Sequence, residues 1–491
     1  MQRILPIARE HALFDIERTR AIEQRAGATL PPHTLMARAG AAVARLALAI
    51  APHAQRVWVA AGPGNNGGDG FEAAAHLQQW GKQVTVSLSS DAASLPADAR
   101  EAAARAQAAG VRIANDFPDD AELAIDALLG IGASRAPKGP IEAAIRQLNS
   151  AACPVLAIDV PSGLHADTGQ PLGPACVTAA HTLTMLTLKP GLFTASGRDH
   201  AGQVWLATLG VDASGETPTA CLSGVTSNRA RHHAQHKGSF GDVAVVGGAA
   251  GMSGAALLAA RAAHAAGAGR VFVDSLDDDG PRLDTVRPEL MFRRGWVQST
   301  PEVLARSTVV CGCGGGDAVR GPLPRVLSLA GRLVLDADAL NALASDAAMA
   351  PLLRARSARG LSSVLTPHPL EAARLLGCST GEVQADRVRA ANAIAAQFGV
   401  IVVLKGSGSV IAAPKQTPRI NSTGNAALAT GGTGDVLAGW LGGRWAALAT
   451  DDTTGAFANA VQCVAEHGAA AEPPPPGALR ADDLIERLYR R

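Results

Sequence analysis

The chain has 491 residues, 47% hydrophobic and 3% aromatic, and this length leaves room for more than one domain of about 100–200 residues. Its formal net charge of +1 argues against a dedicated nucleic-acid-binding protein, which usually carries a strongly basic face. Seven irregularly spaced cysteines argue against a disulfide framework, and no apolar run reaches the roughly 18–20 residues that span a bilayer. We therefore expect a cytoplasmic protein with reduced thiols and no membrane or nucleic-acid partner.

The N-terminal half begins with two predicted helices, at residues 8–27 and 35–50. After them, the run "RVWVAA" precedes a glycine-rich segment at residues 62–70, and a helical run and "QVTVSLS" follow. Strand, glycine loop, helix and strand in this order predict a βαβ unit. Two further buried strands are predicted where the chain reaches Asp126 and Asp159, and each aspartate precedes a loop that contains glycine.

A domain boundary is predicted between Asp212 and Phe240, where the periodic pattern gives way to Ser, Thr, Pro, Gly and charged residues. We expect an N-terminal domain over residues 1–212, a linker over 213–235 and a C-terminal domain over 236–491. The basic cluster at residues 229–237 lies at the end of this linker, and a solvated connection explains it better than a nucleic-acid contact does.

The C-terminal half repeats the order of strand, glycine loop, long helix and strand, although it shows no obvious sequence repeat of the first half. Asp336, His368 and Lys405 each stand where a predicted apolar strand ends. Because ligands of open α/β sheets bind beyond the carboxyl ends of the strands, these three residues are expected to converge on one crevice.

The segment "TGGTG" at residues 430–434 precedes a predicted helix, an arrangement typical of a phosphate cradle. Asp435 follows it at the mouth of the helix, where a carboxylate could accept the proton of an attacking hydroxyl. Nearby N–H groups are expected to keep this carboxylate ionised. Alone, "KGSG" at Lys405 could be a hairpin turn and Asp435 a helix cap, but together they favour a kinase-like site in which Lys405 holds a nucleotide phosphate.

Five motifs of the second half resemble the ADP/ATP-dependent NAD(P)H-hydrate dehydratase family, which has a ribokinase-like α/β fold. The resemblance runs from about residue 236 to the C-terminus and includes "DADALN", "TPHPLEAARLLG", "LKGSGSVIAAP" and "GNAALATGGTGDVLAG". Two segments depart from the family pattern, because G-P-G-L-G reads "GCGGG" at residues 312–316 and P-H-P-G-E reads "PHPLE". The resemblance implies nucleotide contacts at Lys405, Gly406, Ser407, Gly408, Ser409 and Gly434, and substrate contacts at Ala255, Gly314, His368 and Asp435.

The glycine-rich segment of the first half is neither a Walker loop nor a strict G-x-G-x-x-G fingerprint. Its asparagines and aspartate offer donors for a phosphate and oxygens for a cation. Asp126 and Ser162 could complete an oxygen-only site that suits a hard cation. Asp159 is a candidate acid or base, although a single aspartate at the end of a strand more often caps a loop.

These segments, with "GLHADTG" and "LTLKPGLFTASGRDHAGQV", resemble the YjeF N-terminal type of NAD(P)H-hydrate epimerase over residues 14–211. The resemblance implies a Rossmann-like, three-layer α/β domain with a catalytic Asp159 and a K⁺ ion bound by Asn66, Asp126 and Ser162. The implied substrate-binding residues are Asn65, Asn66, Gly67, Gly68, Asp69, Gly130, Ile131, Gly132, Ala133, Ser134, Arg135, Ala136 and Asp159.

The two resemblances together imply repair of the hydrates of NADH and NADPH (NADHX and NADPHX). One domain would interconvert the R and S epimers, and the other would dehydrate the S form with ADP or ATP, ADP being favoured, and with Mg²⁺. A homo-oligomer is also expected. Two alternatives stay open: a small-molecule kinase would accumulate a phosphorylated product, and a dinucleotide sensor would bind its ligand without turnover.

Overall fold

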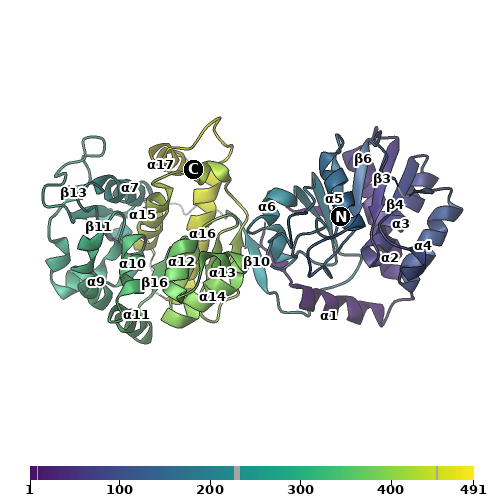
Figure 1. Cartoon of the computed structure of the whole chain (residues 1–491). Helices are drawn as coiled ribbons and strands as arrows, with labels where there is room; N and C mark the ends of the chain where they lie inside the picture. Colours follow the sequence, from purple (N-terminus) through teal and green to yellow (C-terminus); the bar gives the residue numbers. More distant parts are fainter. Residues whose placement is uncertain (8, 115, 226–232, 449–451) are drawn as a thin grey trace. The chain divides into compact units, whose positions relative to one another are not determined.

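A computed structural model describes residues 1–7, 9–114, 116–225, 233–448 and 452–491 of the chain. The chain divides into two compact units, Met1–Leu222 and Ser223–Arg491 (Figure 1). The division falls inside the segment expected to be a linker. The basic cluster at residues 229–237 lies partly on residues 226–232, which are outside the described part of the chain.

In the described part of the first unit, eight strands form one sheet in the order β1-β9-β8-β7-β6-β3-β4-β5. All neighbours are parallel except the edge strand β1, which is antiparallel to β9. Starting from β3, the chain first builds the sheet outward on one side and then on the other, which is the doubly wound order of Rossmann-like domains. The strands are β1 (Gln2–Arg3), β3 (Arg56–Ala61), β4 (Gln83–Leu88), β5 (Arg112–Ala114), β6 (Leu123–Ala127), β7 (Val155–Ile158), β8 (His181–Met185) and β9 (Gln203–Ala207).

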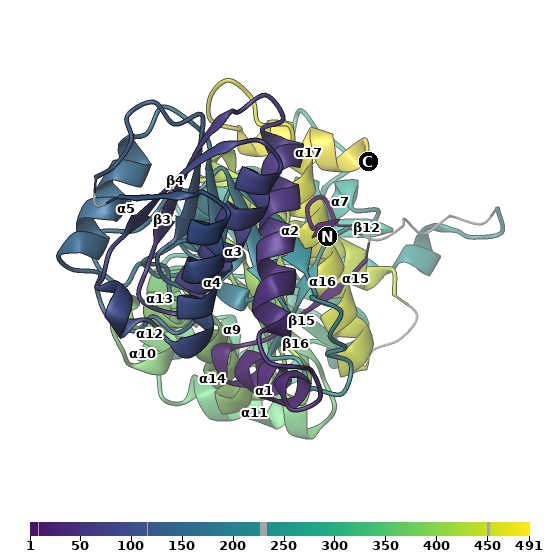
Figure 2. The ribbon, with the colours of Figure 1, turned by 90° about the vertical axis from the view of Figure 1, so that its right-hand side faces the viewer.

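Alternate side chains of β3 enter two different cores, which makes this unit three-layered. Val57 and Val59 pack under α2 (Thr34–Ile50), α3 (Asn65–Gln79) and α4 (Ala97–Ala108), which contact one another (Figure 2). Trp58 packs on the other face with residues of α5 (Pro140–Ser150). Because successive residues of a strand point to opposite faces, an almost wholly apolar strand such as β3 is typical of a sheet covered on both sides.

The first predicted helix is wrong in its N-terminal part, because residues 9–15 are not helical. α1 spans Ile16–Gly27 and begins at a cap in which the Asp15 carboxylate accepts the N–H of Arg18. Ahead of it, β2 (His11–Leu13) pairs antiparallel with β10 (Ala220–Ser223), a strand inside the segment expected to be a linker. Both strands are too short to show a period in the sequence. The second predicted helix is confirmed as α2.

The described sheet of the second unit runs in the order β13-β12-β11-β14-β15-β16-β17-β18-β19. Its strands are parallel from β13 to β17, whereas β18 is antiparallel to both of its neighbours, β17 and β19. The strands are β11 (Asp242–Gly247), β12 (Arg270–Ser275), β13 (Met291–Phe292), β14 (Thr308–Cys311), β15 (Arg332–Leu335), β16 (Ser363–Leu365), β17 (Ile401–Leu404), β18 (Val410–Ala412) and β19 (Arg419–Asn421).

Small residues let the helices of the second unit pack closely. A Cβ on Gly439 of α15 (Thr433–Ala446) would lie 1.9 Å from the carbonyl oxygen of Ala259 on α7 (Ser253–Ala265). These two helices share a core with α16 (Thr453–Ala470) and α17 (Ala481–Tyr489), and this packing accounts for much of the alanine and glycine in the sequence. The remaining α-helices are α6 (Gly197–His200), α8 (Pro301–Arg306), α9 (Leu323–Leu329), α10 (Asp338–Ser345), α11 (Met349–Ala358), α12 (Pro369–Leu376), α13 (Thr380–Ala385) and α14 (Arg387–Phe398).

Among the helices in the described ranges, none combines the length and the apolar character needed to cross a lipid bilayer.

Candidate active sites of the two units

The first unit has a cavity of about 640 Å³ beyond the carboxyl ends of β3, β6 and β7. In a doubly wound sheet this is where the strand order reverses and ligands bind. Among the expected substrate residues, Asn65, Asn66, Asp69, Gly130, Ile131, Gly132, Ala133 and Asp159 line the cavity. Gly67, Gly68, Ser134, Arg135 and Ala136 are not among its lining residues.

The glycine-rich segment is a loop only as far as Gly64, because α3 already begins at Asn65. The expectation that residues 65–69 form a loop is therefore wrong. Glycine is needed here for packing, since a Cβ on Gly67 would lie 2.2 Å from the carbonyl oxygen of Gly62. The first turn of α3 thus borders the cavity through Asn65 and Asn66, with the positive end of the helix dipole at an anion-binding position.

Asp159 follows β7 and presents its carboxylate at the cavity. Its backbone is left-handed, with φ of 69°, a conformation that aspartate tolerates better than most residues do. The N–H of Ile131 donates to Asp159 Oδ2 over 3.2 Å. A Cβ on Gly130 would lie 3.2 Å from Asn66 Oδ1 and 3.4 Å from Asp159 Oδ2, so these two side chains flank the same glycine.

Lys189 also lines the cavity and contacts Asp159, and the sequence motifs did not single it out. Its Nζ lies 2.6 Å from Asp159 Oδ1 and also donates to Thr184 Oγ1 and to the carbonyl oxygen of Met185. Its side chain is only 1% exposed, so the ion pair with Asp159 is almost completely withdrawn from water. The available signal is a single lysine within the apolar run "TLTLKPGLF", because a buried lysine requires a partner.

The carboxyl groups of Glu23 and Asp69 also line the cavity. The pKa of Glu23, on α1, is raised by burial and by the negative charge of Asp159. The pKa of Asp69 is raised well above its usual range by desolvation, then by Asp159 and Glu23. A carboxyl group with a raised pKa can donate a proton to a substrate atom, and a neighbouring carboxylate can accept one. This arrangement suits acid–base chemistry on a polar ligand.

The expected K⁺ ligands Asp126 and Ser162 lie together. Ser162 donates its hydroxyl to Asp126 Oδ1 over 2.6 Å and its N–H to Oδ2 over 2.8 Å. Burial raises the pKa of Asp126 to about 6, so the carboxyl group is mostly charged at neutral pH. Leu129, which precedes Gly130, donates its N–H to the Ser162 hydroxyl. The buried Asn66 amide nitrogen has no hydrogen-bond partner, and because the two ends of an amide are assigned rather than observed, this group fits an oxygen ligand for a cation.

In the second unit, Lys405 and Asp336 converge as the sequence predicts. Lys405 follows β17, Asp336 follows β15, and Nζ lies 2.6 Å from Asp336 Oδ1. Burial by itself lowers the pKa of Lys405, but the carboxylates of Asp336 and Glu371 outweigh it and leave this pKa raised. A Cβ on Gly434, in the first turn of α15, would lie 3.3 Å from Lys405 Nζ. A charged ammonium therefore lies at the helix N-terminus, where a phosphate would bind.

Residues 406–409 connect the antiparallel strands β17 and β18, so "KGSG" is also a hairpin turn. The two interpretations of this segment are compatible, because the turn begins at the lysine that faces Gly434. Gly406, Ser407, Gly408 and Ser409 thereby lie in the same connection as Lys405.

Asp435 lies in the first turn of α15, whose N-cap residue is Gly432. Burial and the nearby charge of Asp336 raise its pKa to about 7, while a hydrogen bond with the Cys313 thiol and the charge of Lys405 act in the opposite direction. Because loss of water is the largest of these influences, the carboxyl group is less fully ionised at neutral pH than the helix N–H groups alone would lead us to expect. The carboxyl group titrates near neutral pH, as a general base should.

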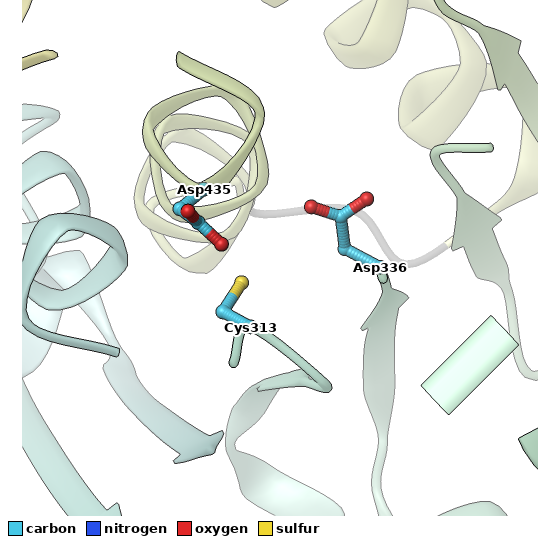
Figure 3. A group of neighbouring side chains, drawn as sticks. All are labelled: Cys313, Asp336 and Asp435. Atoms are coloured by element: carbon cyan, nitrogen blue, oxygen red, sulfur yellow. The ribbon is translucent and has the colours of Figure 1, made fainter. Parts of the chain in front are cut away.

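Cys313, Asp336 and Asp435 bring their sulfur and oxygen atoms within 4.8 Å of one another (Figure 3). Such spacing could accommodate a metal ion. However, the Lys405 ammonium already lies 2.6 Å from Asp336 and supplies the positive charge of this cluster. The arrangement instead places a cation that can bind a phosphate beside a carboxylate that can accept a proton from a hydroxyl.

The other expected substrate residues lie around the same strand ends. A Cβ on Gly314 would lie 2.8 Å from the Cβ of Ala255, so these two residues are adjacent, and Gly314 directly follows Cys313. His368 caps α12, where its Nδ1 accepts the N–H of Leu370 over 3.1 Å. Burial and then the charge of Lys405 lower the pKa of His368, which favours a neutral imidazole.

The fold and the two sites define a two-domain α/β protein, with an acid–base cavity in a Rossmann-like unit and a kinase-like site in the second unit. Residues 32–191 match the family described as YjeF-related protein N-terminus, and residues 243–489 match the family NAD(P)H-hydrate dehydratase. The bifunctional NAD(P)H-hydrate repair enzyme of Escherichia coli (strain K12) is 36% identical over 95% of this chain and 90% of its own length. The chain belongs to the family of bifunctional NAD(P)H-hydrate repair enzymes.

Another relative, the bifunctional NAD(P)H-hydrate repair enzyme of Coxiella burnetii, is 38% identical over 93% of this chain and 94% of its own length. Among solved structures, the ADP/ATP-dependent NAD(P)H-hydrate dehydratase of Bacillus subtilis, co-crystallised with ATP and Mg²⁺, is 30% identical. It covers 53% of this chain and 92% of its own, with a TM-score of 0.44.

Proposed function

We propose that this chain repairs hydrated NADH and NADPH in two steps, epimerisation in the first unit and nucleotide-dependent dehydration in the second. The observation that carries the proposal is that each unit places a carboxylate beside a lysine at the carboxyl edge of its sheet, with the start of a helix at the same place; the lysine is buried in the first unit and half-buried in the second. Each site thus offers an acid–base group and a place for a phosphate, which are the two features that a hydrated nucleotide requires.

In the first unit, Asp159 is the proposed acid–base residue. The substrate hydroxyl is attached to the carbon beside the ring nitrogen, so the nitrogen lone pair can expel it as water once it receives a proton. The resulting iminium is planar, and water can return to either face while giving up a proton. Lys189 holds the Asp159 carboxylate in place, and the first turn of α3 at Asn65 and Asn66 binds a substrate phosphate.

In the second unit, Asp435 is the proposed general base. It takes the proton of the substrate hydroxyl while the oxygen attacks the terminal phosphorus of ADP or ATP, and AMP or ADP departs. Lys405, Gly434 and the turn at residues 406–409 hold the phosphates, and Ala255, Gly314 and His368 border the substrate. Loss of phosphate, driven by the ring nitrogen, and then of a ring proton restores the dihydropyridine.

Two ions belong to the proposal. K⁺ would be held by Asn66, Asp126 and Ser162, where it would offset the buried charge of Asp126. Mg²⁺ bound to the nucleotide would neutralise part of the phosphate charge. ADP as the preferred donor, a homo-oligomeric state and a cytoplasmic location are further parts of the proposal, and light scattering on the purified chain measures the oligomeric state.

The test is to give the purified chain both hydrate epimers with ADP, ATP or no nucleotide, and to follow dihydronicotinamide absorbance and inorganic phosphate. Complete conversion with release of phosphate supports both activities. Conversion that stops once the S epimer is consumed, with the R epimer left over, shows that the first unit does not epimerise. A stable phosphorylated product would instead identify a small-molecule kinase, and binding without turnover would identify a sensor.

A further inference from the structure

The thiol of Cys313 lies in the second site, but the proposed function gives it no role. Cys313 follows β14, its side chain is fully buried, and its sulfur points toward Asp435 (Figure 3). The family pattern G-P-G-L-G has a proline here, whose side chain cannot donate a hydrogen bond. This chain instead has a weak donor beside the proposed base.

The surroundings of Asp435 make such a donor important. The charged groups that face it are Asp336 at the end of β15, Asp338 on α10 and Lys405 at the end of β17. Both aspartates oppose a negative charge on Asp435, and Lys405 makes its direct ion pair with Asp336. The Cys313 sulfur, by contrast, lies within 4.8 Å of a carboxylate oxygen of Asp435 itself, and its influence lowers the pKa of Asp435.

We propose that Cys313 is a positioning residue for dehydration, whose thiol donates a hydrogen bond that favours and orients the charged carboxylate of Asp435. This inference rests on the proposed role of Asp435 as the base. A donor stabilises the ionised form of its acceptor. Loss of the thiol therefore raises the pKa of Asp435 and moves the acidic limb of the dehydration rate to higher pH.

The experiment measures kcat of dehydration from pH 5.5 to 9 with the S hydrate and ADP, for the native chain and Cys313→Ala, Cys313→Ser and Cys311→Ala. Cys311 is the matched control, because its thiol is equally buried but faces the charge of Asp274 rather than that of Asp435. We expect Cys313→Ala to shift the acidic limb upward by up to about one pH unit, since a hydrogen bond to a charged group has that order of effect. Activity at pH 9 should change little.

Cys313→Ser should retain the native limb, because its hydroxyl is also a donor, and Cys311→Ala should leave the profile unchanged. An equal loss at every pH in Cys313→Ala would show that the thiol only fills space, and an unshifted limb would also overturn the inference. Asp435→Asn separates this result from the proposed function. If that variant still dehydrates the hydrate, Asp435 is not the base. If it is inactive while Cys313→Ala keeps the acidic limb of the native pH profile, only the proposed role of Cys313 is wrong.

Discussion

Each unit places a reactive carboxylate close to a lysine that is at least half-buried, but the two units connect these groups differently. In the first unit Lys189 contacts Asp159 itself, whereas in the second Lys405 contacts Asp336 and leaves Asp435 as a neighbour. The first arrangement holds one carboxylate as the partner of a cation. The second leaves a carboxyl group that titrates near pH 7 and keeps the cation beside Gly434 for a phosphate.

This difference matches the chemistry proposed for each unit. Epimerisation is reversible and needs a proton donor and acceptor at one oxygen, which the cluster of Glu23, Asp69 and Asp159 can supply. Phosphoryl transfer needs a base for the hydroxyl and a cation for the phosphate at separate points. Each site needs only one lysine. Lys189 pairs with the proposed acid–base carboxylate itself, whereas Lys405 pairs with a second carboxylate, Asp336, so that the proposed base remains a separate group.

The largest effect should come from removing either carboxylate. Asp435→Asn should lower nucleotide-dependent dehydration by about a hundred- to ten-thousandfold, because general-base catalysis contributes on that order, while epimerisation continues. Asp159→Asn should have the opposite pattern. Each variant serves as the control of the other, with R-to-S conversion and phosphate release measured on the same samples. Loss of both activities in one folded variant contradicts separate sites.

Removing Lys189 should destabilise the first unit. Lys189→Met leaves the Asp159 carboxylate without its partner, and breaking a buried ion pair in this way costs about 3–5 kcal/mol. Chemical denaturation with probes in each unit should show an earlier transition for residues 1–222 and a native one for the rest. Lys82→Met is the matched control, because Nζ of that buried lysine donates to a carbonyl oxygen, that of Pro52. Equal losses in both variants would contradict a special role for the ion pair.

The two activities should also differ in pH dependence. Asp435 must be ionised to accept a proton, and its pKa is raised to about 7 by burial and by Asp336. Dehydration should therefore fall about tenfold for each pH unit below this value and level off above it. The measurement is kcat of dehydration as a function of pH with saturating ADP, by stopped-flow or steady-state kinetics. A rate that stays constant down to pH 5 would mean that another group is the base.

The smallest expected effect is that of K⁺ on the first unit. An ion at about ten times its Kd stabilises the form that binds it by about 1.4 kcal/mol. Replacing KCl with choline chloride should therefore lower the Tm of the first unit alone. Asp126→Asn should remove this response, because the buried charge is absent. A native K⁺ response in that variant would locate the ion elsewhere.

The parts of these sites that come from single strand ends can be predicted from the sequence. Asp159, Asp336, Lys405 and Asp435 each follow an apolar run or a glycine loop, and parallel strands bring such positions to one edge. Lys189 and Glu23 could not be found in this way, because they reach the cavity from a loop and from α1, whose pattern is that of any amphipathic helix.

The pKa of Asp435 also lies beyond sequence reasoning. N–H groups at a helix start are a local feature that the glycine loop predicts, whereas burial, the largest cause of the raised pKa, arises only when segments distant in the sequence come together. The short strands β2 and β10 were missed for a similar reason, since their pairing partner is about two hundred residues away along the chain.

The left-handed backbone at Asp159 determines which substitutions can report on its charge. With φ of 69°, this position accommodates glycine, asparagine and aspartate readily, whereas alanine or glutamate adds conformational strain to any chemical change. A mutational library at this position would thus confuse misfolding with lost reactivity for nearly every member. Asparagine alone keeps the size and the backbone preference while removing the charge, so a reporter for screening should be calibrated on it.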